Sequence, residues 1–323
     1  MYLILGSAFD PCCTLVNSIL KTRGHDVRIM DGLFSEPHRF AWRFAGGGSL
    51  RKGNSRIGVP GEWEAASGEI EGVLMRDIGF RAMHDWSESD AQYMSAEMQA
   101  ALLGWLWSLP GVVVNRVPAW LFYRPRPSFL YWMPYLVRAG LRVPSTVIGN
   151  DTERLKDWRA RHAEGAVLSP ISDHTHFQLQ TDAEWEGVMG IARHAPVLLE
   201  EAHGATQLAC VVGDCVIWDG RLSGAVPEQA QALEARLCAF ARSAGLNFVQ
   251  IAVTEQLSAQ QSYESGYSVV AVEPQVHFAR FETETQKRIA EELANLLTGE
   301  RKHLREREPI GIGAATANGR GAR

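Results

Sequence analysis

The fold is decided by the first 31 residues, which are MYLILGSAFD PCCTLVNSIL KTRGHDVRIM D at positions 1–31. The apolar run Tyr2–Leu5 is typical of a short buried strand, and Asp10 followed by Pro11 supplies a helix N-cap and a proline at the first helical position. Gly24 marks the end of that helix, and Val27–Met30 forms a second apolar run. A strand, a helix and a strand in this order predict a βαβ unit, which opens a parallel sheet in an α/β domain.

The rest of the chain is expected to continue as alternating elements in three parts. Strands are expected at 70–75, 112–114, 166–168, 176–179, 197–199, 208–218, 248–253 and 267–273, and helices at 95–109, 130–139, 151–162, 227–244 and 284–297. The segment Tyr-Arg-Pro-Arg-Pro-Ser at 123–128 disfavours helix and predicts a connection between bodies. We therefore expect an α/β domain at 1–122, a central small subdomain at 123–195, a C-terminal subdomain at 196–298 and a mobile tail at 299–323.

Composition limits the function. The 323 residues include 32 Lys and Arg against 37 Asp and Glu, a formal net charge of −5, so no global positive field would hold a nucleic acid. The chain shows neither a signal peptide nor about 20 consecutive apolar residues, which argues against secretion and against a membrane span. Three glycines at 46–48 predict a surface hairpin rather than a phosphate loop, because no Gly-Lys-Ser or Gly-Lys-Thr follows.

The cysteines indicate a reducing compartment, and we expect a cytoplasmic protein. Five cysteines are odd in number and lack the Cys-x-x-Cys spacing of a redox or metal motif. Cys12 and Cys13 stand where the first helix begins. They are either buried packing residues, the interpretation we favour, or thiols whose pKa is lowered by the helix N-terminus.

Short strings further along the chain carry a resemblance to a known family. They are Val-Val-Val-Asn-Arg at 112–116, Ala-Gly-Leu-Arg-Val-Pro at 139–144, Asn-Asp at 150–151 and Val-Val-Ala-Val-Glu-Pro-Gln at 269–275. In this order, after an α/β opening, they make the chain resemble the ATP-grasp superfamily, most closely the RimK-like ligases and the peptide maturases that crosslink ribosomal peptides. The resemblance implies an α/β (α+β) fold with an N-terminal pre-grasp α/β domain followed by two grasp subdomains.

The resemblance also implies a reaction. In relatives, ATP phosphorylates a carboxylate, and an amine, thiol or hydroxyl then attacks the acyl-phosphate. That chemistry needs a cation on the phosphates and carboxylates that hold magnesium, because the transition state is stabilised mainly by electrostatics. ATP and magnesium are therefore the implied cofactors.

The chain departs from the family at the residues that carry this charge. Ser169 stands where relatives have a phosphate-binding lysine, and Ala252 stands where they have a magnesium-binding aspartate. In the Glu-Val-Asn-Pro signature, Ala271 replaces the glutamate and Glu273 replaces the asparagine. Leu208 aligns with an expected arginine. These losses predict that the phosphate and metal site is dismantled and that ATP and magnesium binding is lost or weak.

Some residues of the implied site survive. Glu200 and Glu201 lie in the hinge where relatives hold adenine and ribose, Arg126 matches a basic residue of the linker, and Ser169 would line the same degenerate site. Glu273 is either a repositioned magnesium ligand or, as we favour, a strand-end glutamate that faces solvent. An alternative metal site would use His174, His176 and His277, since histidine is the commonest metal ligand and residues two apart share a strand face.

We therefore expect a divergent ATP-grasp protein that is non-catalytic, a pseudoenzyme that binds a peptide or a partner protein, such as a partner modification enzyme, in a modification pathway. The alternative is an active ATP-dependent ligase that joins a carboxylate to an amine, thiol or hydroxyl through a rebuilt site. A third possibility is a regulatory protein that binds nucleotide without hydrolysing it. Neither a nucleic acid nor a membrane is expected as a partner, and the oligomeric state stays open.

Overall fold

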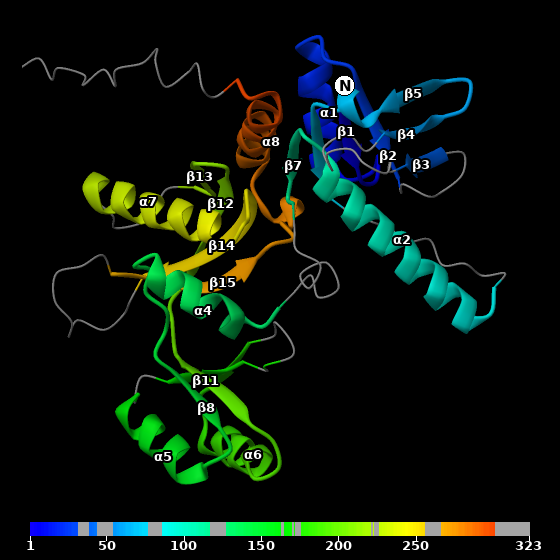
Figure 1. Ribbon diagram of the computed structural model, residues 1–323. Helices are drawn as coiled ribbons and strands as arrows, with labels where there is room; N and C mark the ends of the chain where they lie inside the picture. The colour runs from blue at the N-terminus through cyan, green and yellow to red at the C-terminus, as the bar shows by residue number, and fades with distance from the viewer. Residues whose placement is uncertain are drawn as a thin grey trace, which may run out of the picture.

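The computed structural model describes residues 1–31, 39–43, 54–76, 86–116, 127–162, 165–169, 171, 176–220, 222, 226–255 and 266–300. Figure 1 shows an N-terminal body at one end, a body with helices α5 and α6 at the other, and the sheet of the C-terminal part between them. The predicted mixed α/β fold is confirmed. Among the described helices, none combines the length and apolar character that crossing a bilayer requires.

The N-terminal body is built on the predicted parallel sheet. Its strands β1 (Tyr2–Leu5), β2 (Val27–Met30), β6 (Gly72–Met75) and β7 (Val112–Val114) pair in the order β2-β1-β6-β7, all parallel. Helix α1 (Pro11–Thr22) begins as predicted, because Asp10 Oδ1 accepts a hydrogen bond from the Cys12 N–H at 2.8 Å. The chain leaves α1 through Gly24, whose φ of 83° favours glycine.

A second, antiparallel sheet packs on this body. It contains β3 (Arg39–Arg43), β4 (Asn54–Val59) and β5 (Trp63–Ala66) in the order β3-β4-β5. The antiparallel pairing of β3 with β4 confirms the predicted hairpin, whereas its glycines at 46–48 lie outside the described residues. A 3-10 turn (Ser67–Glu69) leads to β6. Helix α2 (Glu88–Ser108) begins earlier than predicted, because Ser87 caps it by accepting the Asp90 N–H.

The central body has four antiparallel strands. They are β8 (Thr146–Gly149), β9 (Ala166–Leu168), β10 (Phe177–Leu179) and β11 (Val197–Glu201), in the order β10-β9-β11-β8. Helices α5 (Thr152–Arg161) and α6 (Asp182–Ala192) pack together on one face, through a core that includes Trp158 and Trp185. We did not predict α6, although Thr181 and Glu184 form its capping box.

The C-terminal sheet lies next along the chain. Its strands β12 (Thr206–Val212), β13 (Cys215–Trp218), β14 (Phe248–Glu255) and β15 (Tyr267–Glu273) pair antiparallel in the order β13-β12-β14-β15. The predicted helix α7 (Pro227–Ser243) covers one face together with α4 (Phe129–Arg138). After the short turn Phe278–Arg280, helix α8 (Thr283–Thr298) covers the other face and packs against α1.

The sheets do not follow the predicted subdomain limits residue by residue. Strand β11 lies beyond residue 195, in the predicted C-terminal subdomain, but belongs to the central sheet. Helix α4 lies before residue 195, in the predicted central subdomain, but packs on the C-terminal sheet. The division of the chain into subdomains therefore stays a prediction. The connection at 117–126 and the tail at 301–323 lie outside the described residues.

Asn115 connects the N-terminal and C-terminal sheets. It follows β7, is buried, and accepts hydrogen bonds from the backbone N–H groups of Asn247 and Phe248 at 2.9 and 2.7 Å. Its Nδ2 donates to the carbonyls of Phe248 at 2.5 Å and Pro274 at 3.4 Å. One side chain therefore joins the end of β7 to the start of β14 and the segment after β15.

Candidate functional site

Strand register brings Ser169 next to Glu200. Val167 on β9 is the partner of Glu200 on β11, and the Ser169 N–H donates to the Leu198 carbonyl at 3.0 Å, which continues this ladder beyond β9. Because alternate residues of a strand share a face, Val167 and Ser169 lie on the same side of the sheet as Glu200. Helices α5 and α6 cover the opposite side, where Leu168 and Leu199 point.

Ser169, His176 and Glu200 form a connected polar cluster. The Ser169 hydroxyl donates to Glu200 Oε2 at 2.8 Å, and its oxygen lies 2.8 Å from His176 Nδ1. The Ser169 hydroxyl thus lies between a carboxyl group and an imidazole and contacts both.

The environment of Glu200 raises its pKa. The side chain is 2% exposed, and this burial is the main cause that raises the pKa of Glu200 above its ordinary value. The hydrogen bond from Ser169 and the charge of His203 act in the opposite direction but do not cancel the effect. Ser169 therefore stabilises a buried carboxyl group at the position where relatives have a lysine.

The other positions with lost charge form one row across the C-terminal sheet. Leu208 on β12 is the register partner of Ala252 on β14, and Ala252 is the partner of Ala271 on β15. The three side chains therefore share one face of the sheet. Cys210 on β12 and Phe248 on β14 point to the same face, where they pack in the core formed with α8. An arginine, an aspartate and a glutamate at these positions would form a charged strip, whereas this chain offers only apolar groups there.

The next row carries polar groups. Gln250 is the register partner of Glu273, and its Oε1 accepts the His277 N–H at 3.0 Å. Gln250 is buried, whereas Glu273 and His277 are partly exposed. Of the four residues in the pairs Ala252–Ala271 and Gln250–Glu273, Glu273 is therefore the one with a carboxylate that could bind a metal ion.

These residues do not fit a pair of magnesium ions. Magnesium needs several oxygen ligands in near-octahedral geometry, and the row of Leu208, Ala252 and Ala271 offers none from its side chains. Within the part of the chain that the structure describes, no three His, Cys, Asp or Glu side chains are grouped to hold a metal ion.

The remaining predicted site residues are placed as follows. Glu201 is partly exposed, and its N–H donates to the Ser145 carbonyl at 2.9 Å, which continues the pairing with the segment before β8. Arg126 and His174 lie outside the described residues. Of the three predicted histidines, His176 joins the cluster with Ser169 and Glu200, while His277 lies after β15. The nucleotide and metal roles of these residues stay predictions.

A partly buried ion pair lies at the carboxyl edge of the parallel sheet. Arg76 follows β6, and its Nε donates to Asp10 Oδ2 at 2.9 Å, with the guanidinium 5.6 Å from the centre of the Phe248 ring. Asp10 thereby caps α1 with one oxygen and holds Arg76 with the other. Sequence reasoning missed Arg76, although a single arginine directly after an apolar strand was a usable signal.

The cysteines beside this ion pair are buried thiols with raised pKa values. Cys12 and Cys13 are buried, and burial raises the pKa of Cys12 to about 12 and that of Cys13 still higher. The charge of Arg76 lowers both pKa values but does not overcome this desolvation. The predicted packing role of both cysteines agrees with the structure, and all five cysteines are free thiols.

The arrangement of a parallel-sheet domain followed by two antiparallel sheets is that of the ATP-grasp fold, which confirms the fold that the resemblance implied. No family model and no curated protein sequence matches the chain. A RiPP-associated ATP-grasp ligase of Chryseobacterium gregarium, in complex with ADP and a leader and core peptide, superposes with a TM-score of 0.70 at 15% identity, over 93% of this chain and 96% of the other.

Two further solved structures have the same fold. The macrocyclase MdnC of Microcystis aeruginosa, bound with the precursor peptide MdnA, matches with a TM-score of 0.68 at 17% identity, over 93% of this chain and 100% of the other. A RimK domain ATP-grasp protein of Sphaerobacter thermophilus matches with a TM-score of 0.55 at 16% identity, over 93% and 100% of the two chains. These likenesses show the fold of the chain.

Proposed function

We propose that this chain is a divergent ATP-grasp protein of the peptide-maturase type that no longer transfers phosphate and acts by binding a peptide or partner protein in a modification pathway. The observation that carries the proposal is the in-register row Leu208–Ala252–Ala271. Three positions of the family's charged strip lie together in space, and all three are apolar. Because the three positions meet on one sheet face, independent alignment errors are a poor explanation for the three apolar residues found there.

The cluster around Ser169 supports the same proposal. A lysine at this position would place an ammonium beside Glu200, whereas here a hydroxyl forms hydrogen bonds to Glu200 and His176 within the protein. The side chain of Ser169 is 7% exposed. A group that is buried and already bonded within the protein has little capacity left for a phosphate.

A peptide is the partner class that we propose. Two of the matching structures are described as complexes with a precursor peptide or with a leader and core peptide. The conserved overall architecture at 15–17% identity supports retention of a peptide-binding role by a scaffold whose charged strip is gone. The reaction itself would then be carried out by a partner enzyme of the pathway.

A restoration experiment tests the loss of phosphoryl transfer. Leu208→Arg, Ala252→Asp, Ala271→Glu and Glu273→Asn are introduced together with Ser169→Lys, and formation of ADP is measured with and without magnesium, in the wild type and in the variant. The proposal expects no magnesium-dependent ADP formation by the wild type. Turnover by the wild type would contradict it and would favour an active ligase that uses Glu273 and Glu201.

A further inference from the structure

Helix α2 projects from the N-terminal body and is packed only at its C-terminal end. Figure 1 shows the helix running away from the sheet of β1, β2, β6 and β7. None of the residues 88–101 is buried, and the side chains that the helix buries are Leu102, Leu103, Trp105 and Leu106. At 1.5 Å per residue, the projecting part at 88–101 extends about 21 Å from the packed end.

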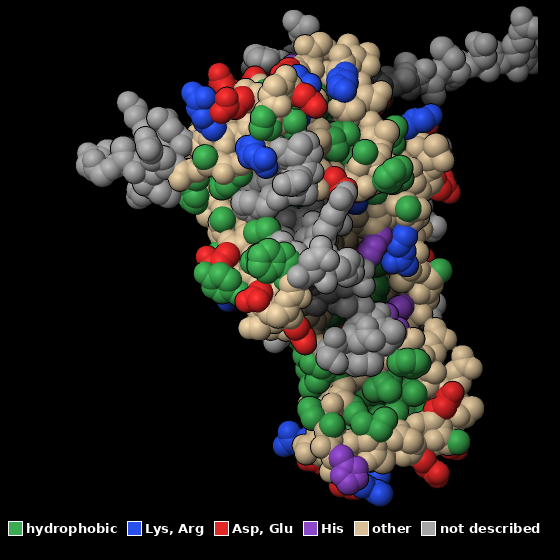
Figure 2. All heavy atoms as spheres, turned by 90° about the vertical axis from the view of Figure 1, so that its right-hand side faces the viewer, with side chains coloured by type: hydrophobic (Ala, Val, Ile, Leu, Met, Phe, Trp, Pro, Cys, Tyr) green, Lys and Arg blue, Asp and Glu red, His purple; other side chains and the backbone are tan. Residues whose placement is uncertain are grey.

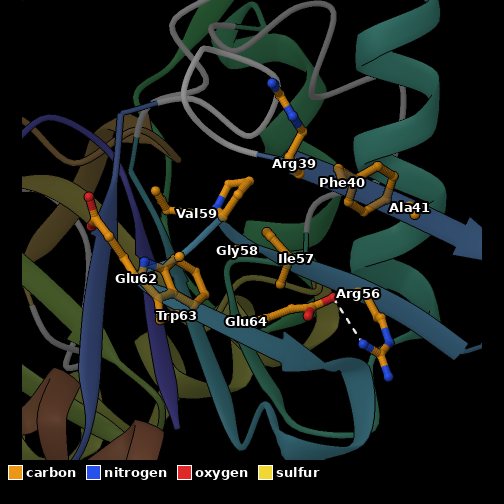
Figure 3. A pocket seen from close by; sticks show the side chains of 12 residues that line it. Arg39, Phe40, Ala41, Arg56, Ile57, Gly58, Val59, Glu62, Trp63 and Glu64 are labelled. Carbon is orange, nitrogen blue, oxygen red and sulfur yellow. Dashed lines mark hydrogen bonds and ion pairs between the residues drawn. The ribbon is translucent and has the colours of Figure 1, made fainter.

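The packed end fixes the direction of the helix. Trp105 Nε1 donates to the buried Ser55 hydroxyl at 2.8 Å, and the Trp105 ring meets Phe40 edge to face with ring centroids 5.7 Å apart. Figure 3 shows Phe40 on β3 beside this helix. The projecting part is therefore presented on a rigid base, which lowers the entropic cost of binding a partner.

The helix turns an apolar face to solvent. Tyr93 is 67% exposed and Trp107 is 56% exposed, and the exposed Ala96 and Ala100 lie between them. Successive spacings of three, four and seven residues place the four side chains on one side of the helix. A surface helix normally turns charged residues to solvent, whereas Glu97 is the one charged residue at 93–108. An exposed apolar face of this kind is typical of a protein interface.

The N-terminal end of the helix is acidic. Residues 88–108 contain Glu88, Asp90 and Glu97 and no lysine or arginine. The side of the molecule from which α2 projects faces the viewer in Figure 2, where hydrophobic and acidic side chains lie next to one another. Asp90 Oδ2 accepts the Ser87 hydroxyl at 2.6 Å, which holds its carboxylate at the start of the helix.

Arg116 places a positive charge at the opposite end of the helix. Its guanidinium carbon lies 5.8 Å from the centre of the Trp107 ring. Its terminal nitrogens donate at 2.9–3.0 Å to the carbonyls of Leu106, Trp107, Leu109 and Gly111. Burial lowers the pKa of Arg116, and no carboxylate of the described residues counteracts this effect. The charge therefore has neutral partners in the described part of the chain.

The positions of these groups along the helix are symmetric about Ala100. Tyr93 precedes Ala100 by seven residues, and Trp107 follows it by seven. If two copies of the helix lie antiparallel around a two-fold axis at Ala100, Tyr93 of one copy lies at the level of Trp107 of the other. Asp90 then lies at the level of residue 110, where Arg116 of the other copy holds the end of the helix. A two-fold interface is self-complementary in this way, and the small side chain of Ala100 lets the two axes approach closely.

From the projecting helix, its exposed apolar face and the opposite charges at its two ends, we propose that α2 pairs antiparallel with α2 of a second copy of this chain and forms a symmetric dimer. Tyr93 of each copy covers Trp107 of the other, and Asp90 of each copy faces Arg116 of the other. Apolar contact at the centre and charged pairs at the margins are the usual arrangement of a protein interface. The dimer goes beyond the proposed function and does not depend on it.

The test measures the mass of the purified full-length protein by analytical ultracentrifugation over a wide range of protein concentration. We expect an equilibrium between monomer and dimer in the wild type. Ala100→Glu brings two like charges together at the axis and is expected to raise the dissociation constant of the dimer at least about tenfold. Ala235→Glu, at an exposed position on α7, is the matched control and should leave the dissociation constant unchanged. Glutamate is a good helix former, so both variants should fold, which circular dichroism checks.

A cross-link locates the axis. Ala100→Cys brings the two introduced thiols together across the axis, so oxidation by diamide should give a disulfide-linked dimer, whereas Ala235→Cys should give none. A wild type that is monomeric at every concentration would overturn the inference and leave the apolar face to a partner of another kind. A dimer that Ala100→Glu does not weaken, or the absence of a cross-link through Ala100→Cys, would also overturn it. None of these results depends on nucleotide turnover, so the proposed function is tested separately.

Discussion

Replacement of Ser169 by alanine tests whether the position of the family lysine now carries a structural hydrogen-bond cluster. The hydroxyl lies 2.8 Å from Glu200 Oε2 and 2.8 Å from His176 Nδ1, and both Ser169 and Glu200 are buried. Alanine removes both bonds and keeps the volume of the site nearly unchanged. Glu200 then stays buried with one hydrogen-bond donor fewer.

The magnitude follows from the charge of Glu200. A hydrogen bond to a charged group contributes about 1.5–3 kcal/mol, and one to a neutral group about 1 kcal/mol. We therefore expect Ser169→Ala to lower the free energy of unfolding by about 1 kcal/mol at acid pH and by about 2–3 kcal/mol once Glu200 is ionised. The loss grows as pH rises, because the hydrogen bond from Ser169 lowers the pKa of Glu200.

The assay is urea unfolding between pH 4 and pH 9, followed by fluorescence and circular dichroism. Ser243→Ala is the control, because Ser243 Oγ donates to the uncharged Phe240 carbonyl at 2.8 Å and should give a small, pH-independent change. In a Glu200→Gln background the cost of Ser169→Ala should fall to about 1 kcal/mol at every pH. A cost below about 0.5 kcal/mol, or one that does not change with pH, would refute the reasoning.

Three further changes have defined outcomes. Burial raises the pKa of Glu200, so the native state binds the proton of Glu200 more tightly than the unfolded state does. The free energy of unfolding of the wild type should therefore decrease as pH rises above about 4.5, the ordinary pKa of a glutamate. Glu200→Gln should remove that decrease, and parallel pH profiles of the wild type and the variant would contradict this. Arg76→Met leaves Asp10 without its ion-pair partner and should lower the free energy of unfolding, measured in urea, by about 2–4 kcal/mol. Adding Asp10→Asn to Arg76→Met should recover at least half of that loss. If the effects of the two substitutions simply add in the double variant, the result would argue against a direct ion pair. Asn115→Ala removes four hydrogen bonds and should cost about 3 kcal/mol or more, with faster hydrogen exchange in β7 and β14; unchanged exchange there would show that Asn115 does not hold the two sheets together.

The elements that could be predicted from the sequence are those with strong local signals. Asp10 and Pro11 predicted the start of α1, and the spacing of apolar residues predicted α7 and the strands of the parallel sheet. Helix α6 was missed because Gly187 and Gly190 interrupt it and glycine disfavours helix, although the capping box at Thr181 and Glu184 marked its start. Strands β5 and β8 are short and gain their stability from pairing, which local sequence does not encode.

The site was less predictable than the fold. That Ser169 contacts Glu200 depends on the register between β9 and β11, which is set by long-range pairing of segments about 30 residues apart in the chain. The row of Leu208, Ala252 and Ala271 could be expected only through the family resemblance, and the register then placed the three residues on one face. Periodicity within one strand predicts which of its residues share a face. Which residues of the adjacent strands lie beside them depends on the register, which the structure shows.

We propose that the site for ATP and magnesium has lost its function. The most direct test of this loss is calorimetric titration of the purified full-length protein with ATP and with ADP, each with and without magnesium, accompanied by thermal unfolding at the same nucleotide concentrations. We expect no binding heat and no shift in melting temperature up to about 1 mM nucleotide, since binding to the native state would raise its stability. Magnesium-dependent binding of ATP with a dissociation constant in the micromolar range would contradict it.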